Sequence, residues 1–338
     1  MRSLGLDIGG ANTKAVLFED EEMETYWLEY IPLWEDWKKL REFLEELESD
    51  FHPQKVGITM TGELSDIFET KRAGVRKIGK TVKEIFSGDL YYFSVDGRFV
   101  SEEKAYDSPY KLSASNWVSS ALLVGRKRPN CLMIDVGSTT TDIIPVKEKK
   151  PTPAGWTDLE RLQTGELIYT GVLRTQPPYL KSRLSINDKS YGIAAEYFAN
   201  MADAYRILDV LRKEDYTCET PDGRGKEKKA CMRRLARLFC SDLEKLEEDL
   251  IVKAAEEFRD AQVSMVVDAI KEVARIHKIS KTLSVVLMGV GGEILARKAA
   301  NQAGFKEIVN LSKIYNDVAT LMPPAYGLGL LVKEEVTS

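Results

Sequence analysis

The sequence predicts an α/β protein of two related domains that bind a ligand in the cleft between them. Its 338 residues suit two domains, because one domain takes roughly 150 residues. A strand, an Asp-x-Gly turn and a second strand occur near the start and again near the middle of the chain. A later apolar strand runs into a glycine-rich turn. We place the boundary in the turn-rich segment 126–130, which gives domains at residues 1–128 and 129–338.

The composition is that of an ordinary globular protein, with 43% hydrophobic and 30% charged residues. The formal net charge of −5 disfavours general nucleic-acid binding, which needs clustered positive charge. No run of about 18 apolar residues and no signal-peptide core is present, so we expect a cytoplasmic protein that does not enter a membrane. An oligomer of identical chains is left open.

The strongest pattern is an internal repeat. Placing Asp7 on Asp135 also places Gly9 on Gly137. In each copy an apolar strand leads into Asp-x-Gly, a turn of small residues and a second apolar strand. This pattern is typical of a β-hairpin with a polar, glycine-bearing tip. The sequence therefore predicts the same hairpin twice.

Such tips suit phosphate groups. Glycine allows positive φ and a close approach of backbone N–H groups to a ligand, and hydroxyl groups add donors. The predicted phosphate-binding residues at the tips are Gly9, Gly10, Asn12, Thr13, Gly137, Ser138, Thr139 and Thr140. Asp7 and Asp135 are the predicted ligands of a hydrated cation, Mg²⁺, that contacts phosphate oxygens. The alternative is a pair of ordinary Asx-Gly turns, which are common singly.

The remaining segments alternate between helix and strand. In the first domain we predict helices at residues 34–47, 79–86 and 112–123, and strands at 55–60 and 90–94. In the second we predict helices at 194–211, 229–239, 249–276, 293–302 and 325–332, and strands at 284–288 and 308–311. The long segment 249–276 is one helix or two short ones. The basic stretch 226–237 is expected to be a solvated helix face; the alternative is contact with a diphosphate, if this helix borders the cleft.

The third motif is the glycine-rich turn. The strand at 284–288 ends in Gly289-Val290-Gly291-Gly292, which opens a helix at Glu293. Alone, this is a weak signal. Because it follows two predicted phosphate hairpins, we expect it to be the loop that binds adenosine or an equivalent part of the substrate. The alternative is close packing of the helix on the strand.

These elements in this order resemble the superfamily of actin, the heat-shock chaperone ATPases and the sugar kinases. The order is phosphate hairpin, connecting helix, second hairpin, glycine loop and final helix. The resemblance implies duplicated actin-like (ribonuclease H-like) domains, with mixed five-stranded sheets flanked by helices and a cleft between the domains. In the second domain it implies a helical insertion and a C-terminal helix that packs back at the cleft.

A narrower resemblance is to the hydantoinase/oxoprolinase branch. It is carried by segments 5–14, 59–64, 68–75, 135–142 and 161–167. Together these segments are similar to a family of methanofuran-biosynthesis synthases. The resemblance implies a transferase that joins an aminomethylfuran-methyl diphosphate to the phenol of γ-glutamyltyramine and releases diphosphate. The implied partners are these small-molecule substrates.

This reaction assigns roles to charged residues. A cation at Asp7 and Asp135, with Lys14, would neutralise the leaving diphosphate. The phenol, with a pKa near ~10, benefits from a base; Glu63 is the first candidate and Glu166 the second. The remaining predicted substrate-binding residues are Thr61, Gly62, Lys71, Arg72, Glu166, Gly291 and Gly292. The alternatives are a helix-capping role for Glu63 and a solvated helix or loop face for the basic residues Lys71 and Arg72.

Other interpretations stay open at this point. The same fold suits an ATP-dependent small-molecule kinase or an oxoprolinase-like amidohydrolase, or a nucleotide-sensing assembly protein without enzymatic activity. His52 and His277 are expected at the surface. The four cysteines lack CxxC spacing and are expected as reduced thiols; a metal site from three of them is the alternative. The cysteines are Cys131, Cys218, Cys231 and Cys240.

Overall fold

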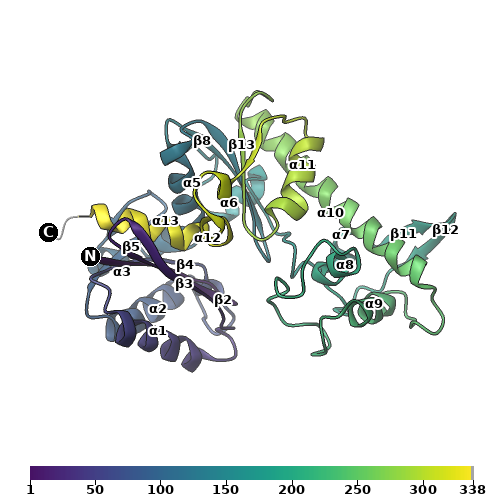
Figure 1. The fold of residues 1–338 in the computed structure, drawn as a ribbon, viewed down its shortest axis with the longest axis horizontal. Helices are drawn as coiled ribbons and strands as arrows, with labels where there is room; N and C mark the ends of the chain where they lie inside the picture. The colour runs from purple at the N-terminus through teal and green to yellow at the C-terminus, as the bar shows by residue number, and fades with distance from the viewer. Residues whose placement is uncertain (336–338) are drawn as a thin grey trace. The chain divides into compact units, whose positions relative to one another are not determined.

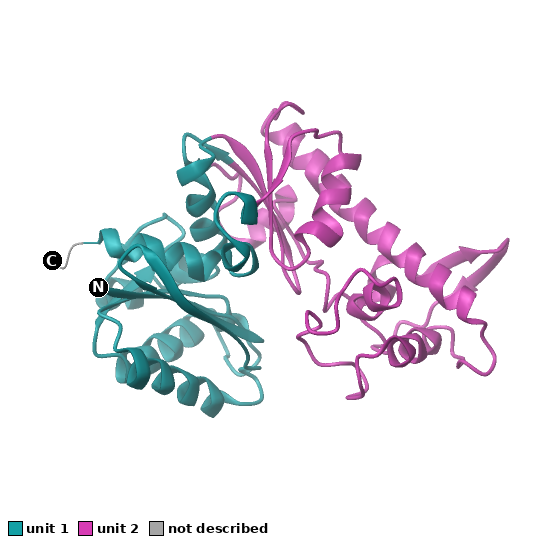
Figure 2. Ribbon diagram, viewed as in Figure 1, with its two compact units in different colours: residues 1–129, 146–151, 311–338 teal, residues 130–145, 152–310 magenta. Residues whose placement is uncertain are grey.

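The computed structural model of the protein describes residues 1–335. The chain forms two compact units, shown in two colours in Figure 2. Unit 1 comprises residues 1–129, 146–151 and 311–338, and unit 2 comprises residues 130–145 and 152–310. The first break falls one residue after the expected boundary. The expected second domain differs from unit 2 at its end, because residues 311–338 return to unit 1.

The sheet of unit 1 has the strand order β3-β2-β1-β4-β5-β6. Its first three strands form an antiparallel meander, and β1, β4 and β5 run parallel. The strands are β1 (Arg2–Ile8), β2 (Asn12–Glu19), β3 (Glu22–Tyr30), β4 (Lys55–Met60), β5 (Asp89–Phe93) and β6 (Phe99–Val100). A short strand, β9 (Lys150–Pro151), pairs with the end of β8 (Thr141–Lys147) and is counted with unit 1.

Helices follow the strands of unit 1, and most of them are labelled in Figure 1. They are α1 (Trp37–Phe51), α2 (Lys71–Ile85), α3 (Glu102–Asp107), α4 (Pro109–Leu112), α5 (Asn116–Lys127), α12 (Asp317–Leu321) and α13 (Pro323–Leu331), with 3₁₀ turns at Gly62–Leu64, Leu311–Lys313 and Val332–Glu334. The amphipathic pattern of α1 buries Leu40, Leu44 and Leu47 against the core of unit 1, as a helical period of 3.6 requires.

The C-terminal helix α13 belongs to unit 1 because it packs directly on β1, β2, β4 and α5. The closest approach is at Gly5, where a Cβ atom would lie 2.0 Å from the carbonyl oxygen of Ala325 and 2.5 Å from the amide nitrogen of Gly329. Only a residue without a side chain allows two backbones to come this close. The N-terminal strand and the C-terminal helix are therefore fixed together.

The sheet of unit 2 repeats the order of unit 1, with β10-β8-β7-β13-β14 in place of β3-β2-β1-β4-β5. As in unit 1, the pairs β7–β13 and β13–β14 are parallel, and β10 is antiparallel to β8. The strands are β7 (Cys131–Val136), β8 (Thr141–Lys147), β10 (Leu167–Ile168), β13 (Val285–Met288) and β14 (Ile308–Asn310). The two units are duplicated actin-like folds.

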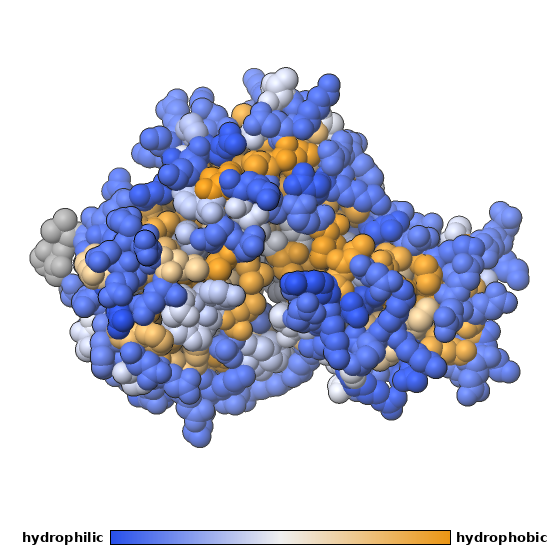
Figure 3. Space-filling view, in the orientation of Figure 1, coloured by the Kyte–Doolittle hydropathy of each residue, from blue (hydrophilic) through white to orange (hydrophobic). Residues whose placement is uncertain are grey.

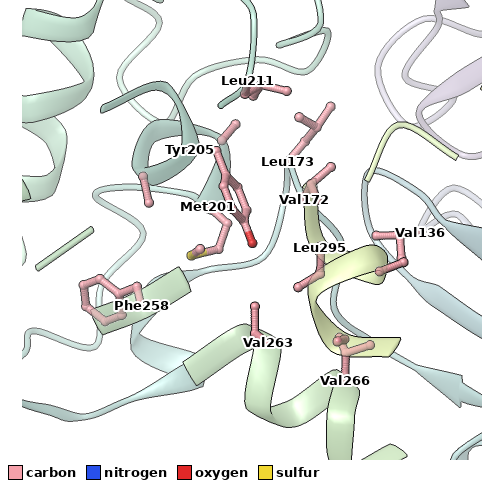
Figure 4. Packing of buried hydrophobic residues seen from close by; sticks show 14 of the residues in the cluster. Val136, Val172, Leu173, Met201, Tyr205, Leu211, Phe258, Val263, Val266 and Leu295 are labelled. Atoms are coloured by element: carbon pink, nitrogen blue, oxygen red, sulfur yellow. The ribbon is translucent and has the colours of Figure 1, made fainter. Parts of the chain in front are cut away.

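Between β10 and β13, unit 2 carries a mainly helical insertion. It contains a two-stranded sheet and ends in α10, a single helix of 29 residues. The elements of unit 2 outside the main sheet are α6 (Asp158–Thr164), α7 (Pro177–Leu180), β11 (Arg183–Ile186), β12 (Lys189–Gly192), α8 (Met201–Ile207), α9 (Lys228–Arg237), α10 (Glu248–Ile276), a π-helical turn (Gly292–Ala296) and α11 (Arg297–Gln302). One apolar core joins the insertion to the sheet, and Figure 4 shows part of it.

The structure corrects several expected boundaries. Each sheet has six strands in place of the expected five, because β6 and β9 add short hairpin arms. The helix expected at 79–86 starts at Lys71, since Thr70 caps it and accepts a hydrogen bond from the Ala73 amide. The helix expected at 194–211 is only α8, which begins at a capping box formed by Asn200 and Asp203.

The visible face of each unit is largely hydrophilic, as Figure 3 shows and as 30% charged residues lead one to expect. Within residues 1–335, no helix combines the length and the apolar character needed to span a membrane.

The contact at Gly5 gives a test of the α13 docking. Gly5→Ala is expected to lower the free energy of unfolding by roughly 1–3 kcal/mol, because the added methyl group meets backbone atoms that cannot rotate away. Gly192→Ala is the control, since the nearest atom to its Cβ is the side-chain Nη1 of Arg183 at 3.8 Å. Urea denaturation of both variants checks this, and equal midpoints would contradict it.

Candidate functional site

The first hairpin joins β1 to β2 at the edge where the parallel strands of unit 1 end. Asp7 pairs with Lys14 and Ile8 pairs with Thr13 across the ladder. The Gly9 amide closes the tip by donating to the carbonyl oxygen of Asn12 at 3.0 Å. The tip residues are thus held in a fixed turn directly after a buried strand.

The second hairpin closes in the same way. The Gly137 amide donates to the carbonyl oxygen of Thr140 at 2.9 Å, between β7 and β8. This contact is the counterpart of the one between Gly9 and Asn12, at the spacing that the repeat predicts. The structure therefore confirms that the hairpin is present twice, once in each unit.

Hairpin 1 contains buried polar atoms that have no hydrogen-bond partner among the described residues. They are Oδ1 of Asp7, Oδ1 of Asn12, Oγ1 of Thr13 and, nearby, Oγ of Ser65. The other carboxylate oxygen of Asp7, Oδ2, lies 3.2 Å from Nζ of Lys14. A buried polar atom without a partner costs roughly 1–3 kcal/mol, so such a cluster is typical of a place that a ligand or water completes.

The turn after β4 lies directly against hairpin 1. The Thr61 amide donates to the carbonyl oxygen of Ile8 at 3.0 Å. A Cβ atom on Gly62 would lie 3.0 Å from the carbonyl oxygen of Gly9, and one on Gly10 would lie 3.1 Å from Oγ of Ser65. The structure thus brings together the predicted residues Thr61 and Gly62 with the first tip.

Glu63, in the same turn, is buried, with 1% of its surface exposed. The Ser113 hydroxyl donates a hydrogen bond to its Oε1, and Nζ of Lys71 lies 3.9 Å from that oxygen. Helix α2 presses on it, since a Cβ on Gly74 would lie 2.7 Å from the Glu63 Cα. Glu63 and Lys71 are therefore neighbours beside hairpin 1, and Lys71 is the more exposed of the two.

The predicted binding residue Arg72 follows Lys71 on α2 but has a different environment. Its guanidinium lies 5.9 Å from the ring centroid of Tyr110. Arg72 is exposed, which agrees with the alternative of a solvated face. This stacking is a cation–π contact.

A feature that sequence reasoning missed lies over both tips. In unit 2 the amides of Leu173 and Arg174 donate to the carbonyl oxygen of Ser138, at 3.1 and 2.9 Å. In unit 1 the Leu33 amide donates to the carbonyl oxygen of Gly10 at 2.9 Å. In each unit the segment after the third strand crosses the hairpin tip. The repeat of the hairpin was visible in the sequence, but these crossing segments share no residue pattern.

A buried chain of hydrogen bonds holds the crossing segment of unit 2. The side-chain amide of Gln262, on α10, donates to Oγ1 of Thr170 at 2.8 Å and to the carbonyl oxygen of Gly171 at 2.9 Å. Its carbonyl oxygen accepts from the Tyr205 hydroxyl at 2.7 Å. All of these side chains are buried. The long helix therefore fixes the segment that lies on hairpin 2.

The glycine loop after β13 packs on hairpin 2. Gly289 has φ of +77°, and a Cβ there would lie 2.4 Å from Oδ1 of Asp135. A Cβ on Gly291 would lie 2.3 Å from Val136 and 2.6 Å from Val172. These contacts give Gly291 the packing role that was the alternative at this motif; a ligand role for Gly291 and Gly292 stays a prediction.

Glu166, predicted as a base or substrate ligand, is bound inside unit 2. Its carboxylate accepts hydrogen bonds from the amides of Ala154 and Gly155 at 2.7 and 3.0 Å, and from the Thr164 hydroxyl at 2.9 Å. Its Oε1 also lies 2.7 Å from Nε2 of His277. The contacts assign Glu166 to the fold, and they give His277, which was expected at the surface, a partly buried position beside this carboxylate.

The cysteines do not form a metal site. Cys131, Cys218 and Cys231 are buried, Cys240 is exposed, and none is in a disulfide. Residues 1–335 contain no cluster of three His, Cys, Asp or Glu side chains placed to hold a metal ion. Burial raises the pKa of Cys218 to about 11 and that of Cys231 to about 12. Both thiols are therefore protonated at neutral pH, as expected of reduced structural cysteines.

Comparison with known proteins assigns the chain to a family. Residues 54–327 match the family model described as hydantoinase/oxoprolinase. A protein of Methanocaldococcus jannaschii named (4-{4-[2-(gamma-L-glutamylamino)ethyl]phenoxymethyl}furan-2-yl)methanamine synthase is 34% identical over 336 residues, 98% of each chain. A protein of the same name from Methanococcus vannielii is 32% identical over 211 residues, which cover 62% of this chain and 93% of that protein.

The fold also has a likeness among solved structures. A nucleotide-free acetone carboxylase structure superposes with a TM-score of 0.57 and 10% identity, over 91% of this chain and 68% of that chain. At this identity the likeness shows the fold alone.

The structural role of Glu166 can be tested by stability. Glu166→Gln is expected to lower the free energy of unfolding by roughly 1–3 kcal/mol, because the new NH₂ group opposes donors that a carboxylate accepts. Thermal denaturation at neutral pH measures this, with the exposed Glu219→Gln as the matched control. An unchanged melting temperature for Glu166→Gln would contradict the assignment.

Proposed function

We propose a function for this chain from one premise: it belongs to the hydantoinase/oxoprolinase family, and within it to the family of (4-{4-[2-(γ-L-glutamylamino)ethyl]phenoxymethyl}furan-2-yl)methanamine synthases. The chain is a transferase of methanofuran biosynthesis. It joins an aminomethylfuran-methyl diphosphate to the phenol of γ-glutamyltyramine. The observation that carries this proposal is 34% identity over 98% of the chain to the relative of that name.

The product's name defines the bond that forms, which is an ether between a phenol oxygen and a CH₂ group on the furan ring. The phenol oxygen attacks this carbon as the bond from carbon to diphosphate oxygen breaks. The diphosphate leaves with the electron pair, and the phenol proton passes to a base. Positive charge that develops on the CH₂ carbon is shared by the electron-rich furan ring. The barrier therefore depends on how well the leaving diphosphate is stabilised.

Hairpin 1 has the groups that this leaving group needs. The Lys14 ammonium lies beside the Asp7 carboxylate at 3.2 Å and supplies positive charge. The unpartnered oxygens of Asn12 and Thr13 are places where a ligand or its bound water adds a hydrogen bond; the Thr13 hydroxyl is itself a donor. Fixed donors aimed at developing charge typically contribute a factor of roughly 10² to 10³ in rate.

The residues also suit the Mg²⁺ ion that we propose as a cofactor. Mg²⁺ is usually held by one or two carboxylates together with waters and phosphate oxygens, without a cage of protein ligands. Asp7, whose Oδ1 is buried and unpartnered within the described chain, would hold it on hairpin 1, and Asp135 is the residue in the same place on hairpin 2. When bound, the ion would add positive charge to the diphosphate oxygens.

Glu63 is our proposed base, and Lys71 and Arg72 are proposed to bind substrate anions. The carboxylate of Glu63 lies beside hairpin 1 and already accepts a hydrogen bond from the Ser113 hydroxyl. Lys71, the half-buried neighbour of Glu63, keeps positive charge near any phenolate that forms. The substrates are small and charged, which suits the cytoplasmic location that we propose.

The proposal is tested by turnover without nucleotide. The chain is incubated with Mg²⁺, the furan-methyl diphosphate and γ-glutamyltyramine, and the release of diphosphate and the ether product is measured. We expect one diphosphate per ether with no requirement for ATP. Stoichiometric consumption of ATP would contradict the proposal and favour a kinase or an oxoprolinase-like amidohydrolase.

Lys14→Met in the same assay tests the role of hairpin 1. The variant is expected to lower kcat/KM by roughly 10² to 10³, because it removes positive charge from the leaving group. Lys38→Met is the control, because its side chain is 83% exposed and pairs with Glu42 on the same helix. Equal activity of the two variants would exclude hairpin 1 from the chemistry.

A further inference from the structure

The two hairpins differ at one charged position. Under the alignment of the repeat, Lys14 of hairpin 1 corresponds to Asp142 of hairpin 2. Asp142 is already bound by the buried Arg161, whose Nη1 lies 2.7 Å from its Oδ1. Hairpin 2 therefore has an acidic residue where hairpin 1 has the Lys14 ammonium, although its tip closes in the same way.

Arg174 is the cationic residue of the segment 171–175, which crosses the tip of hairpin 2. Its amide donates to the carbonyl oxygen of Ser138 at 2.9 Å, next to the Leu173 amide, which donates to the same oxygen at 3.1 Å. Gly171 makes this approach possible, because a Cβ there would lie 2.5 Å from the Thr139 amide nitrogen. Arg174 is thus attached through its backbone to a tip that has hydroxyl groups but no ammonium or guanidinium of its own.

The backbone around Arg174 is fixed on both sides. Before it, the carbonyl oxygen of Leu173 accepts from the Ala202 amide at 3.2 Å. After it, Oγ1 of Thr175 accepts from the Gly171 amide at 2.8 Å, and the carbonyl oxygen of Thr175 accepts from the Met201 amide at 2.8 Å. Figure 4 shows Leu173 and Val172 within the buried group that includes Tyr205 and Val263. The neighbours are buried while Arg174 itself stays partly exposed.

The guanidinium also acts on side chains of the insertion. Burial raises the pKa of Cys218, and the positive charge of Arg174 is the largest influence in the opposite direction. Burial likewise raises the pKa of Tyr197, and a hydrogen bond with Asn200 and then the charge of Arg174 lower it. The charge of Arg174 therefore acts on two side chains of the insertion, Tyr197 and Cys218.

We propose that Arg174 is an anion-binding residue of hairpin 2, which contacts phosphoryl oxygens of a diphosphate bound at this tip. The inference rests on the proposed function and extends it to a residue outside the repeated motif. A guanidinium presents two parallel N–H donors to a phosphate and stays charged at every working pH. In this arrangement Arg174 supplies for hairpin 2 the positive charge that Lys14 supplies for hairpin 1.

The test measures diphosphate binding separately from turnover. Inorganic diphosphate with Mg²⁺ is titrated calorimetrically into the wild type, Arg174→Gln, Arg174→Lys and the exposed control Arg233→Gln. Arg174→Gln is expected to weaken binding about tenfold or more, which is ~1.4 kcal/mol or more. Arg174→Lys is expected to recover part of the loss, and the control to stay within about twofold.

Kinetics of the same variants complete the test. Arg174→Gln is expected to raise KM for the furan-methyl diphosphate and to leave KM for γ-glutamyltyramine within about twofold. Unchanged diphosphate binding by Arg174→Gln, or a rise confined to the KM of γ-glutamyltyramine, would overturn the inference. If the wild type binds diphosphate but does not form the ether, the proposed function fails while the calorimetry still decides the role of Arg174. If the wild type does not bind diphosphate, both proposals fail.

Discussion

One backbone hydrogen bond at each hairpin tip is the constraint on which the rest of the site depends. Gly9 closes the first tip onto Asn12, and Gly137 closes the second onto Thr140. Each closed tip follows a buried central strand and is crossed by a later segment that donates amides to it. The amides and hydroxyls of the tips are therefore held in place before any ligand arrives, which is the condition for electrostatic stabilisation of a leaving group.

The polar residues around the tips divide into two groups by their contacts. Arg161 and Glu166 have buried partners inside unit 2, and they hold the strands and loops behind hairpin 2. Asp7, Asn12 and Thr13 keep buried oxygens without partners in the part of the chain that the structure describes. A buried oxygen without a partner destabilises the fold, and such atoms are kept where function uses them. We therefore place the chemistry at hairpins 1 and 2, and not at the fully hydrogen-bonded carboxylate of Glu166.

The sequence predicted the duplicated hairpins and the actin-like class because both depend on local patterns, namely strand, Asp-x-Gly and strand. It missed the crossing segments, since Leu33 and Arg174 contact the tips through backbone amides, which every residue except proline can provide. It also missed the contact of Glu166 with His277, which joins residues 111 positions apart. Helix starts were displaced where a cap decided them, as at Thr70 and Asn200. The cleft between the domains and the metal stay predictions.

Hydrogen exchange of the wild type with and without inorganic diphosphate and Mg²⁺ tests the central claim most directly. The account predicts slower amide exchange in two separate peptides, one covering residues 9–13 and one covering residues 137–140, with the same dependence on diphosphate concentration. Protection that is absent from both tips, or that ATP produces and diphosphate does not, would contradict it.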